Sequence, residues 1–170
     1  MAPAPPPLPV AVRRRYHGRM EIVDFRPDLA PAFKALNEAW ITRLFALEPK
    51  DREVLGDPQG KVIDAGGHLL FAEEAGEIVG CVALMRLADG GYEVAKMTVS
   101  ESLRGSGLGR RLMQRCIEAG AEAGAPRLYL ETNSSLAPAL GLYRAMGFRK
   151  IAEPPATDYV RCDVWMERPY

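Results

Sequence analysis

The chain has 170 residues, a length that suits one domain with its own hydrophobic core. Lys plus Arg and Asp plus Glu are equal at 22 each, so no global charge favours nucleic acid or an anionic membrane as a partner. Three widely spaced cysteines, two histidines and no apolar run of 18 residues predict reduced thiols, a cytoplasmic location, no metal site and no membrane span.

Residues 1–18 are rich in Pro and Arg and show no apolar periodicity, so they are expected to form a disordered tail. The apolar stretch of this tail precedes Arg13-Arg14-Arg15, which reverses the order found in a signal peptide. A ligand for a proline-binding module is the alternative interpretation. Residues 19–170 are expected to form one domain.

This domain is expected to begin with a strand and two helices. Residues 20–25 alternate apolar and polar side chains and end at Arg26-Pro27, as a strand does. Apolar residues then recur at helical spacing from Phe33 to Leu47. A second, short helix is expected over 49–55, before Gly56-Asp57-Pro58 breaks it.

The next segments predict an antiparallel meander and then a second helical region. The three strands of the meander are expected at His68–Glu74, Glu77–Leu87 and Tyr92–Val99. The apolar period then becomes that of a helix from Leu108 to about Ala123. The remaining elements are a strand over 127–132, a helix over 138–146 capped by Gly147, and strands over 149–152 and 160–167. A mixed sheet with helices on its faces follows from this order.

The most informative segment joins the third meander strand to the long helix. It reads Arg104-Gly105-Ser106-Gly107-Leu108-Gly109-Arg110. Glycines let the backbone approach a phosphate, and the free N–H groups at a helix start carry the positive end of its dipole. The turn therefore predicts a pyrophosphate site. It is neither a P-loop, which needs Gly-Lys-Ser/Thr, nor a dinucleotide fingerprint, because Arg110 stands where the third glycine belongs.

The turn resembles the signature of the GNAT superfamily of N-acetyltransferases: Arg or Gln, two residues, Gly, any residue, then Gly or Ala. Arg104, Gly107 and Gly109 match it. Residues 139–148, ALGLYRAMGF, are similar to the family's alanine, leucine-tyrosine and glycine-phenylalanine pattern. The resemblance covers about residues 20–167. It implies an α/β (α+β) fold with a mixed, mostly antiparallel six- to seven-stranded sheet, helices on both faces, and acetyl-CoA as cofactor.

The resemblance also implies which residues bind coenzyme A. The strand before the glycine turn separates from its parallel neighbour, so its free backbone groups can bind pantetheine. The Met97 N–H would stabilise the oxyanion, and Val99 would hydrogen-bond the pantetheine amide. Leu136 stands where the family often has Asn, and Asn133 or Ser135 are candidates to replace it. The expected cofactor-binding residues are Met97, Thr98, Val99, Leu103, Arg104, Gly105, Ser106, Gly107, Leu108, Gly109, Arg110, Asn133 and Tyr143.

Glu93 is the candidate general base, because an amine bound as ammonium must lose a proton before it attacks a thioester. Several relatives hold the base at the same offset from the glycine turn. Glu131 is the other carboxylate expected near the cleft. Strand alternation is expected to place four residues on one face, namely Glu93, Ala95, Met97 and Val99.

Tyr143 is the candidate acid that protonates the departing thiolate, by its position in the leucine-tyrosine pair. The expected function is acetyl transfer from acetyl-CoA to a primary amine of a small molecule, such as an amino acid or a polyamine. A protein or peptide amine acetyltransferase and a non-catalytic acyl-CoA-sensing module are the alternatives, and a homodimer is expected by analogy. The residues expected around the acceptor are Asn37, Glu38, Trp40, Arg43, Glu48, Asp158 and Tyr159.

Overall fold

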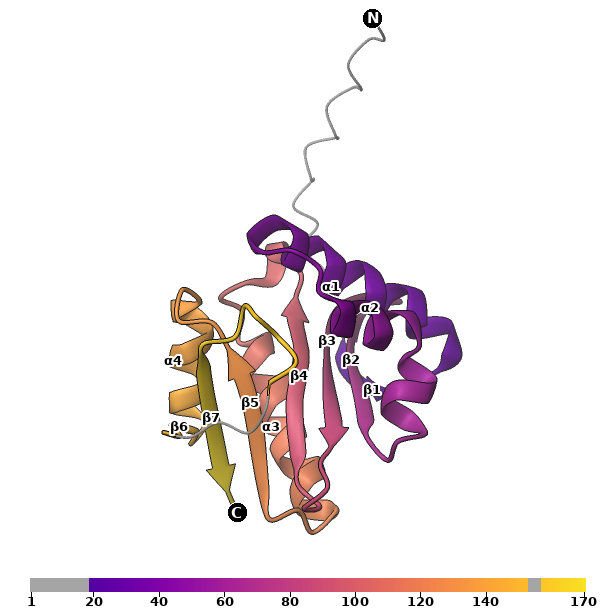
Figure 1. The fold of residues 1–170 in the computed structure, drawn as a ribbon. Helices are drawn as coiled ribbons and strands as arrows, with labels where there is room; N and C mark the ends of the chain where they lie inside the picture. The colour runs from indigo at the N-terminus through magenta and orange to yellow at the C-terminus, as the bar shows by residue number, and fades with distance from the viewer. Residues whose placement is uncertain (1–18, 153–156) are drawn as a thin grey trace, which may run out of the picture.

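A seven-stranded sheet in the order β1-β2-β3-β4-β5-β7-β6 organises the computed structural model, which describes residues 19–152 and 157–170 (Figure 1). All neighbouring strands pair antiparallel except β4 and β5, which confirms the mixed, mostly antiparallel sheet. The expected tail over residues 1–18 lies outside the described residues. The strands are β1 (Met20–Asp24), β2 (His68–Glu74), β3 (Glu77–Arg86), β4 (Tyr92–Val99), β5 (Arg127–Thr132), β6 (Arg149–Lys150) and β7 (Val164–Pro169).

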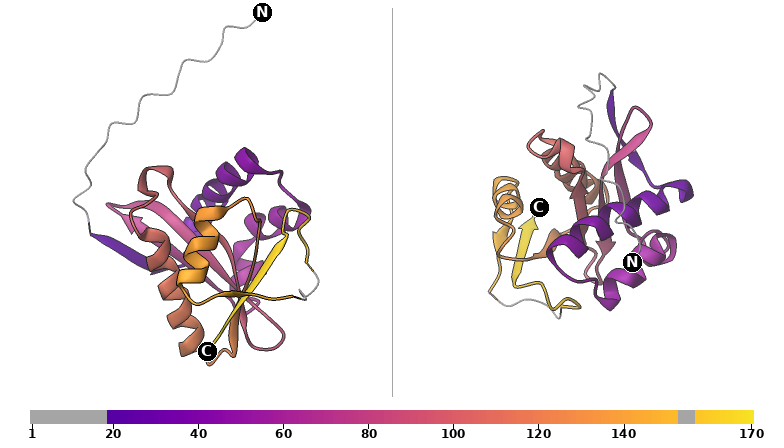
Figure 2. Two further views of the ribbon diagram at one scale, coloured as in Figure 1. Left: turned by 90° about the vertical axis from the view of Figure 1, so that its left-hand side faces the viewer. Right: turned by 90° about the horizontal axis from the view of Figure 1, so that it is seen from above.

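Helices cover both faces of the sheet, as expected. The apolar faces of α1 and α2 form one core with the sheet, and those of α3 and α4 form another on the opposite face. Figure 2 shows α3 on one side of the sheet and α1 with α2 on the other. The helices are α1 (Ala30–Leu44), α2 (Pro49–Gly56), α3 (Leu108–Glu122) and α4 (Ala137–Ala145), with 3-10 turns η1 (Pro27–Leu29) and η3 (Glu101–Leu103) and a π-helical turn η2 (Gln59–Ile63).

The parallel strands β4 and β5 diverge soon after they begin (Figure 1). They pair at only two positions, Tyr92 with Leu128 and Glu93 with Tyr129. From Val94 to Val99, β4 keeps its pairing with β3 but has no register with β5. The sheet therefore opens on that side of β4, as the resemblance implied, and leaves backbone polar groups there to be satisfied by something else.

A β-bulge interrupts β4 at Lys96. The β3–β4 register shifts at this point, and Lys96 has φ of 54°, in the left-handed region that residues other than glycine rarely adopt. Val94 lies in the core beneath α3, and Met97, three residues later, packs against the same core. Residues on one face of a regular strand are an even number of positions apart, but Val94 and Met97 are separated by three. The bulge has therefore reversed the alternation of side chains along the strand. The prediction that Glu93, Ala95, Met97 and Val99 share one face is therefore wrong.

The last strand begins later than expected. β7 starts at Val164, whereas the sequence pattern predicted a strand from residue 160. The N–H groups of Val160 and Arg161 instead donate to the carboxylate of Glu48, at 2.7 and 3.3 Å. Val160 is 95% exposed, so its apolar side chain does not indicate a buried strand. The preceding strand is also shorter than expected, since β6 contains only Arg149 and Lys150.

Candidate active site

A cleft of about 790 Å³ follows the opening between β4 and β5 and reaches the start of α3. Among the expected cofactor-binding residues, Ser106 and Arg110 do not line it. The Ser106 hydroxyl accepts the N–H of Leu108 at 3.4 Å, and the Arg110 guanidinium contacts the sulfur of Met146 at 3.5 Å. The expected residues that do line this donor cleft are Met97, Thr98, Val99, Leu103, Arg104, Gly105, Gly107, Leu108, Gly109, Asn133 and Tyr143.

The glycine turn has a backbone that favours glycine for two different reasons. Gly105 and Gly107 have φ of 77° and 86°, so a side chain there would be strained even though open space surrounds both positions. A Cβ on Gly109 would lie 3.4 Å from Leu142 and 3.5 Å from Met97, at the closed end of the turn. The first N–H groups of α3 have no helical acceptors, and Leu108 and Gly109 at this helix start line the cleft, so the turn fits a pyrophosphate.

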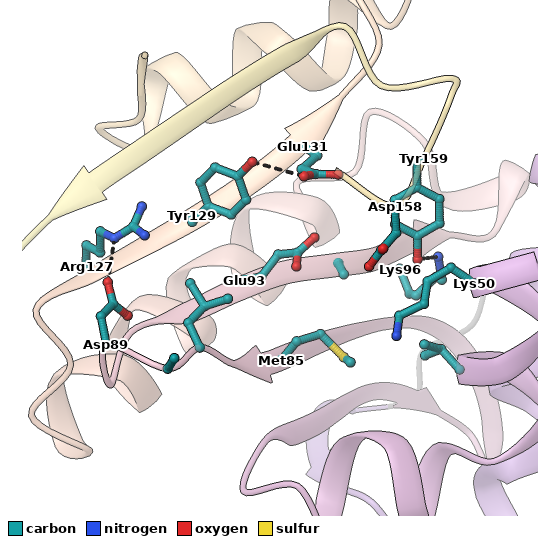
Figure 3. Close-up of a pocket in the computed structure, with 14 residues that line it drawn as sticks. Lys50, Met85, Asp89, Glu93, Lys96, Arg127, Tyr129, Glu131, Asp158 and Tyr159 are labelled. Carbon is teal, nitrogen blue, oxygen red and sulfur yellow. Dashed lines mark hydrogen bonds and ion pairs between the residues drawn. The ribbon is translucent and has the colours of Figure 1, made fainter. Parts of the chain in front are cut away.

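Glu93 lies where the donor cleft meets a second pocket of about 340 Å³ on the α2 side of the sheet (Figure 3). The carboxylate is half-buried and accepts no hydrogen bond from the residues that the structure describes. Burial raises its pKa to about 7, and the nearby charge of Glu131 adds to the effect. A carboxylate with this pKa can take up a proton at neutral pH.

Glu131, the other candidate carboxylate, is held by hydrogen bonds. The hydroxyl of Tyr129 donates to one of its oxygens at 3.0 Å, and that of Thr157 donates to the other at 2.7 Å. Each bond satisfies one oxygen of the carboxylate, and together they fix its orientation. Glu131 also lines both cavities, so the structure brings the two candidate carboxylates together. Of the two, only Glu93 has carboxylate oxygens that accept no hydrogen bond from the described residues.

Tyr143 lies on α4 and lines the donor cleft across from β4. Its ring packs against Phe148, with the ring centres 6.1 Å apart. Burial raises the pKa of the phenol to about 12, and the neighbouring Cys162 contributes to the shift. The phenol therefore carries its proton throughout the neutral range.

A buried ion network beside the bulge was not anticipated from the sequence. Asp51 of α2 is fully buried and accepts the Lys96 ammonium at 2.6 Å and the Arg161 guanidinium at 2.5 and 2.7 Å. Burial alone would raise the pKa of Asp51, but the hydrogen bonds from Arg161 and Lys96 outweigh it and lower the pKa to about 2. Lys96 also donates to the Tyr159 hydroxyl at 3.0 Å. The network thus ties α2 to the bulge and to the segment before β7.

The residues expected around the acceptor divide into structural and pocket-lining groups. Asn37 is buried, donates to the Phe33 carbonyl at 2.9 Å and accepts the Trp40 indole N–H, while Glu48 holds the segment before β7. Neither has a free polar group to offer a substrate. Glu38 is absent from the lining of both cavities. Trp40 and Arg43 line the donor cleft, Asp158 lines the smaller pocket, and Tyr159 lines both.

Comparison with known proteins places this chain in a family. Residues 29–148 match the acetyltransferase (GNAT) family. An IAA acetyltransferase from Azospirillum brasilense is 41% identical over 82 residues, which cover 48% of this chain and 54% of that protein. The similarity thus spans about half the length of that relative.

Solved structures share the fold over nearly their full length. A GNAT-family acetyltransferase from Staphylococcus aureus Mu50 has a TM-score of 0.80 at 21% identity, and the match covers 89% of this chain and 99% of that one. The paia N-acetyltransferase from Thermoplasma acidophilum, solved in complex with coenzyme A, has a TM-score of 0.72 at 14% identity, with coverage of 89% and 99%.

The chain therefore belongs to the acetyltransferase (GNAT) family. This confirms the class of enzyme expected from the glycine turn, an N-acetyltransferase that uses acetyl-CoA. Across residues 19–152 and 157–170, no helix is both long and apolar enough to cross a membrane.

Proposed function

We propose that the protein transfers the acetyl group of acetyl-CoA to a primary amine of a small molecule, by direct attack of the amine on the thioester. The observation that carries this proposal is the position of Glu93. Its carboxylate, with a pKa of about 7, lies at the junction of a cleft suited to the cofactor and a smaller pocket suited to an acceptor.

In this proposal the backbone binds the cofactor. N–H groups of the glycine turn and of the first turn of α3 hold the pyrophosphate, and Arg104 adds positive charge. The free edge of β4 binds the pantetheine arm through Thr98 and Val99, with Asn133 on the facing strand end. The Met97 N–H stabilises the negative charge that develops on the thioester oxygen. Acetyl-CoA itself supplies an acetyl group already activated as a thioester.

Two side chains move protons in this mechanism. Glu93 accepts a proton from the bound ammonium, either directly or through water, and so frees the nitrogen lone pair with which the neutral amine attacks the thioester. Tyr143 donates its phenolic proton to the departing coenzyme A thiolate. Because both cavities reach Glu93 while Tyr143 lines only the donor cleft, the base and the acid can act on opposite sides of the thioester.

The smaller pocket supports a small acceptor. Its volume of about 340 Å³ is at the lower end of the range for ligand pockets, roughly 300–1,000 Å³. A protein or peptide amine is the alternative acceptor, and an acyl-CoA sensor is the alternative function. A cytoplasmic location also belongs to this proposal, and the homodimer stays a prediction.

The test is release of thiol from acetyl-CoA with a pooled library of amines, in the wild type and in Glu93→Gln and Tyr143→Phe. We expect release in the wild type and a loss of about 10²- to 10⁴-fold when the base is removed. Calorimetry with acetyl-CoA should show that both variants still bind the cofactor. Tight cofactor binding without release for any amine would favour the sensor, and equal rates in all three proteins would remove both catalytic assignments.

A further inference from the structure

The smaller pocket of about 340 Å³, called the acceptor pocket from here on, contains three carboxylates that have no cationic partner among the described residues. Glu93, Glu131 and Asp158 all line the pocket, and no ion pair within residues 19–152 and 157–170 involves any of them. Figure 3 shows the carboxylates of Glu93 and Asp158 directed toward the same space, with Glu131 on the neighbouring strand. Like charges that share a small pocket repel each other, so the empty pocket favours a positively charged occupant.

The cations of the same pocket are already paired. The Lys96 ammonium is bound to Asp51 at 2.6 Å, and the Arg127 guanidinium is bound to Asp89 at 3.0 Å. Lys50, a half-buried residue of the lining, pairs with Glu53 of its own helix at 3.2 Å. None of them is left without a carboxylate partner, so the pocket offers little to a substrate that carries its own carboxylate. Amino acids and polyamines both carry a primary amine, but only amino acids also carry a carboxylate. The pocket therefore favours polyamines over amino acids.

The three carboxylates differ in depth. Glu93 is half-buried next to the donor cleft, Glu131 is half-buried and fixed by two hydroxyl groups, and Asp158 is exposed at the mouth. A carboxylate held in advance by hydrogen bonds loses little freedom when a ligand binds. Burial raises the pKa of Glu93 most. The charges of Glu131 and Asp158 raise it further, against the opposing effect of Lys96 and Lys50, so the three carboxylates act on the same region.

We propose that the acceptor is a small aliphatic diamine or polyamine, with its reacting nitrogen at Glu93 and a second ammonium facing Glu131 and Asp158. The inference rests on the proposed function, because it assigns the substrate class of the same site. In this arrangement the second ammonium compensates the charge of the outer carboxylates and orients the chain. The first nitrogen then lies at the base, beside the opening of β4.

The experiment compares three matched series of compounds with three to six methylene groups: diaminoalkanes, alkylamines and ω-amino acids. Each series carries the same reacting amine and differs only in the far group, which is an ammonium, a methyl group or a carboxylate. We expect kcat/KM to be highest for a diamine, about 10- to 100-fold above the alkylamine of the same length, as for one charge-assisted contact. The ω-amino acid should be the poorest of the three.

Charge-neutral variants test the assigned contacts. Asp158→Asn and Glu131→Gln should each reduce the diamine-to-alkylamine ratio of kcat/KM by about tenfold. The matched control is Glu118→Gln on the exposed side of α3, outside both cavities, which should leave the ratio unchanged. Calorimetry with a diaminoalkane and coenzyme A provides a readout that does not depend on turnover, and the binding constant should fall in the same two variants.

The possible failures are distinguishable. Acetylation of alkylamines or ω-amino acids at least as fast as diamines would overturn this inference and leave the proposed function intact. Preference for a peptide amine would do the same. If the diamine preference is unchanged in both Asp158→Asn and Glu131→Gln, the assigned contacts are wrong. No acetylation of any amine, with acetyl-CoA bound, would overturn the proposed function as well.

Discussion

Asp51→Asn should destabilise the fold more than any other single charge-neutralising change in α2. The substitution removes the carboxylate that accepts Lys96 and Arg161 and leaves the ammonium of Lys96, a residue only 7% exposed, without its countercharge. Breaking a buried ion pair from one side costs about 3–5 kcal/mol. Total stabilities are roughly 5–15 kcal/mol, so the change removes a large fraction. At about 2–4 °C per kcal/mol, the melting temperature should fall by about 6–20 °C.

The pH dependence of this effect has a definite sign. The pKa of Asp51 is lowered from 3.8 to about 2 in the folded protein, so its stabilisation is present above pH 3.8 and is lost as the pH falls through 2. The shift corresponds to about 2 kcal/mol of the difference between wild type and Asp51→Asn. Urea unfolding at pH 7 and at a series of lower pH values should show this difference shrinking as the solution becomes more acidic.

The matched control lies on the same helix. Glu53 pairs with Lys50 across an exposed surface, so Glu53→Gln should cost less than about 1 kcal/mol. A loss of under 1 kcal/mol for Asp51→Asn, or a loss that does not depend on pH below 4, would refute the idea that the buried network stabilises the fold.

Three further predictions concern the site. Because the pKa of Glu93 is about 7 and that of Tyr143 about 12, kcat/KM should rise with pH through 7 and stay level to pH 9, and Glu93→Gln should lose the rise. Ionising Glu93 opposes folding, so the stability of wild type relative to Glu93→Gln should fall as the pH rises from 4.5 through 7, measured by urea unfolding. Gly107→Ala should cost about 1–2 kcal/mol and weaken acetyl-CoA binding in calorimetry, whereas Gly141→Ala inside α4 should be neutral or stabilising.

The order of the elements and the glycine turn could be predicted from the sequence because both depend on local patterns. The helical period after Leu108 and the glycines at 105 and 107 are visible within a few residues, and the conformations that they predict do not require a distant partner. The opening beside β4 was predicted only by resemblance, because nothing in the residues of a strand says where its neighbour will diverge.

The ion network and the start of β7 could not be predicted in the same way. Asp51 and Arg161 are 110 residues apart. In the sequence, nothing around either residue distinguishes it from an ordinary surface charge. The sequence of the segment from Val160 resembles a strand. In the structure, however, the N–H of Val160 donates to the carboxylate of Glu48, 112 residues away. Such contacts depend on tertiary packing, which overrides local strand propensity.

The bulge at Lys96 explains how one strand can serve two cavities. In a regular strand, Glu93 and Met97 would lie on the same face of the sheet. Met97 could then not pack against the core beneath α3 while Glu93 faced the pocket on the other side of the sheet. The extra residue reverses the alternation, so Glu93 faces the acceptor pocket while Met97 packs beneath the glycine turn. A non-glycine residue in the left-handed region is unfavourable by about 1–3 kcal/mol and persists only where its surroundings hold it. The bond to Asp51 anchors the side chain of Lys96, which lines both cavities, to α2.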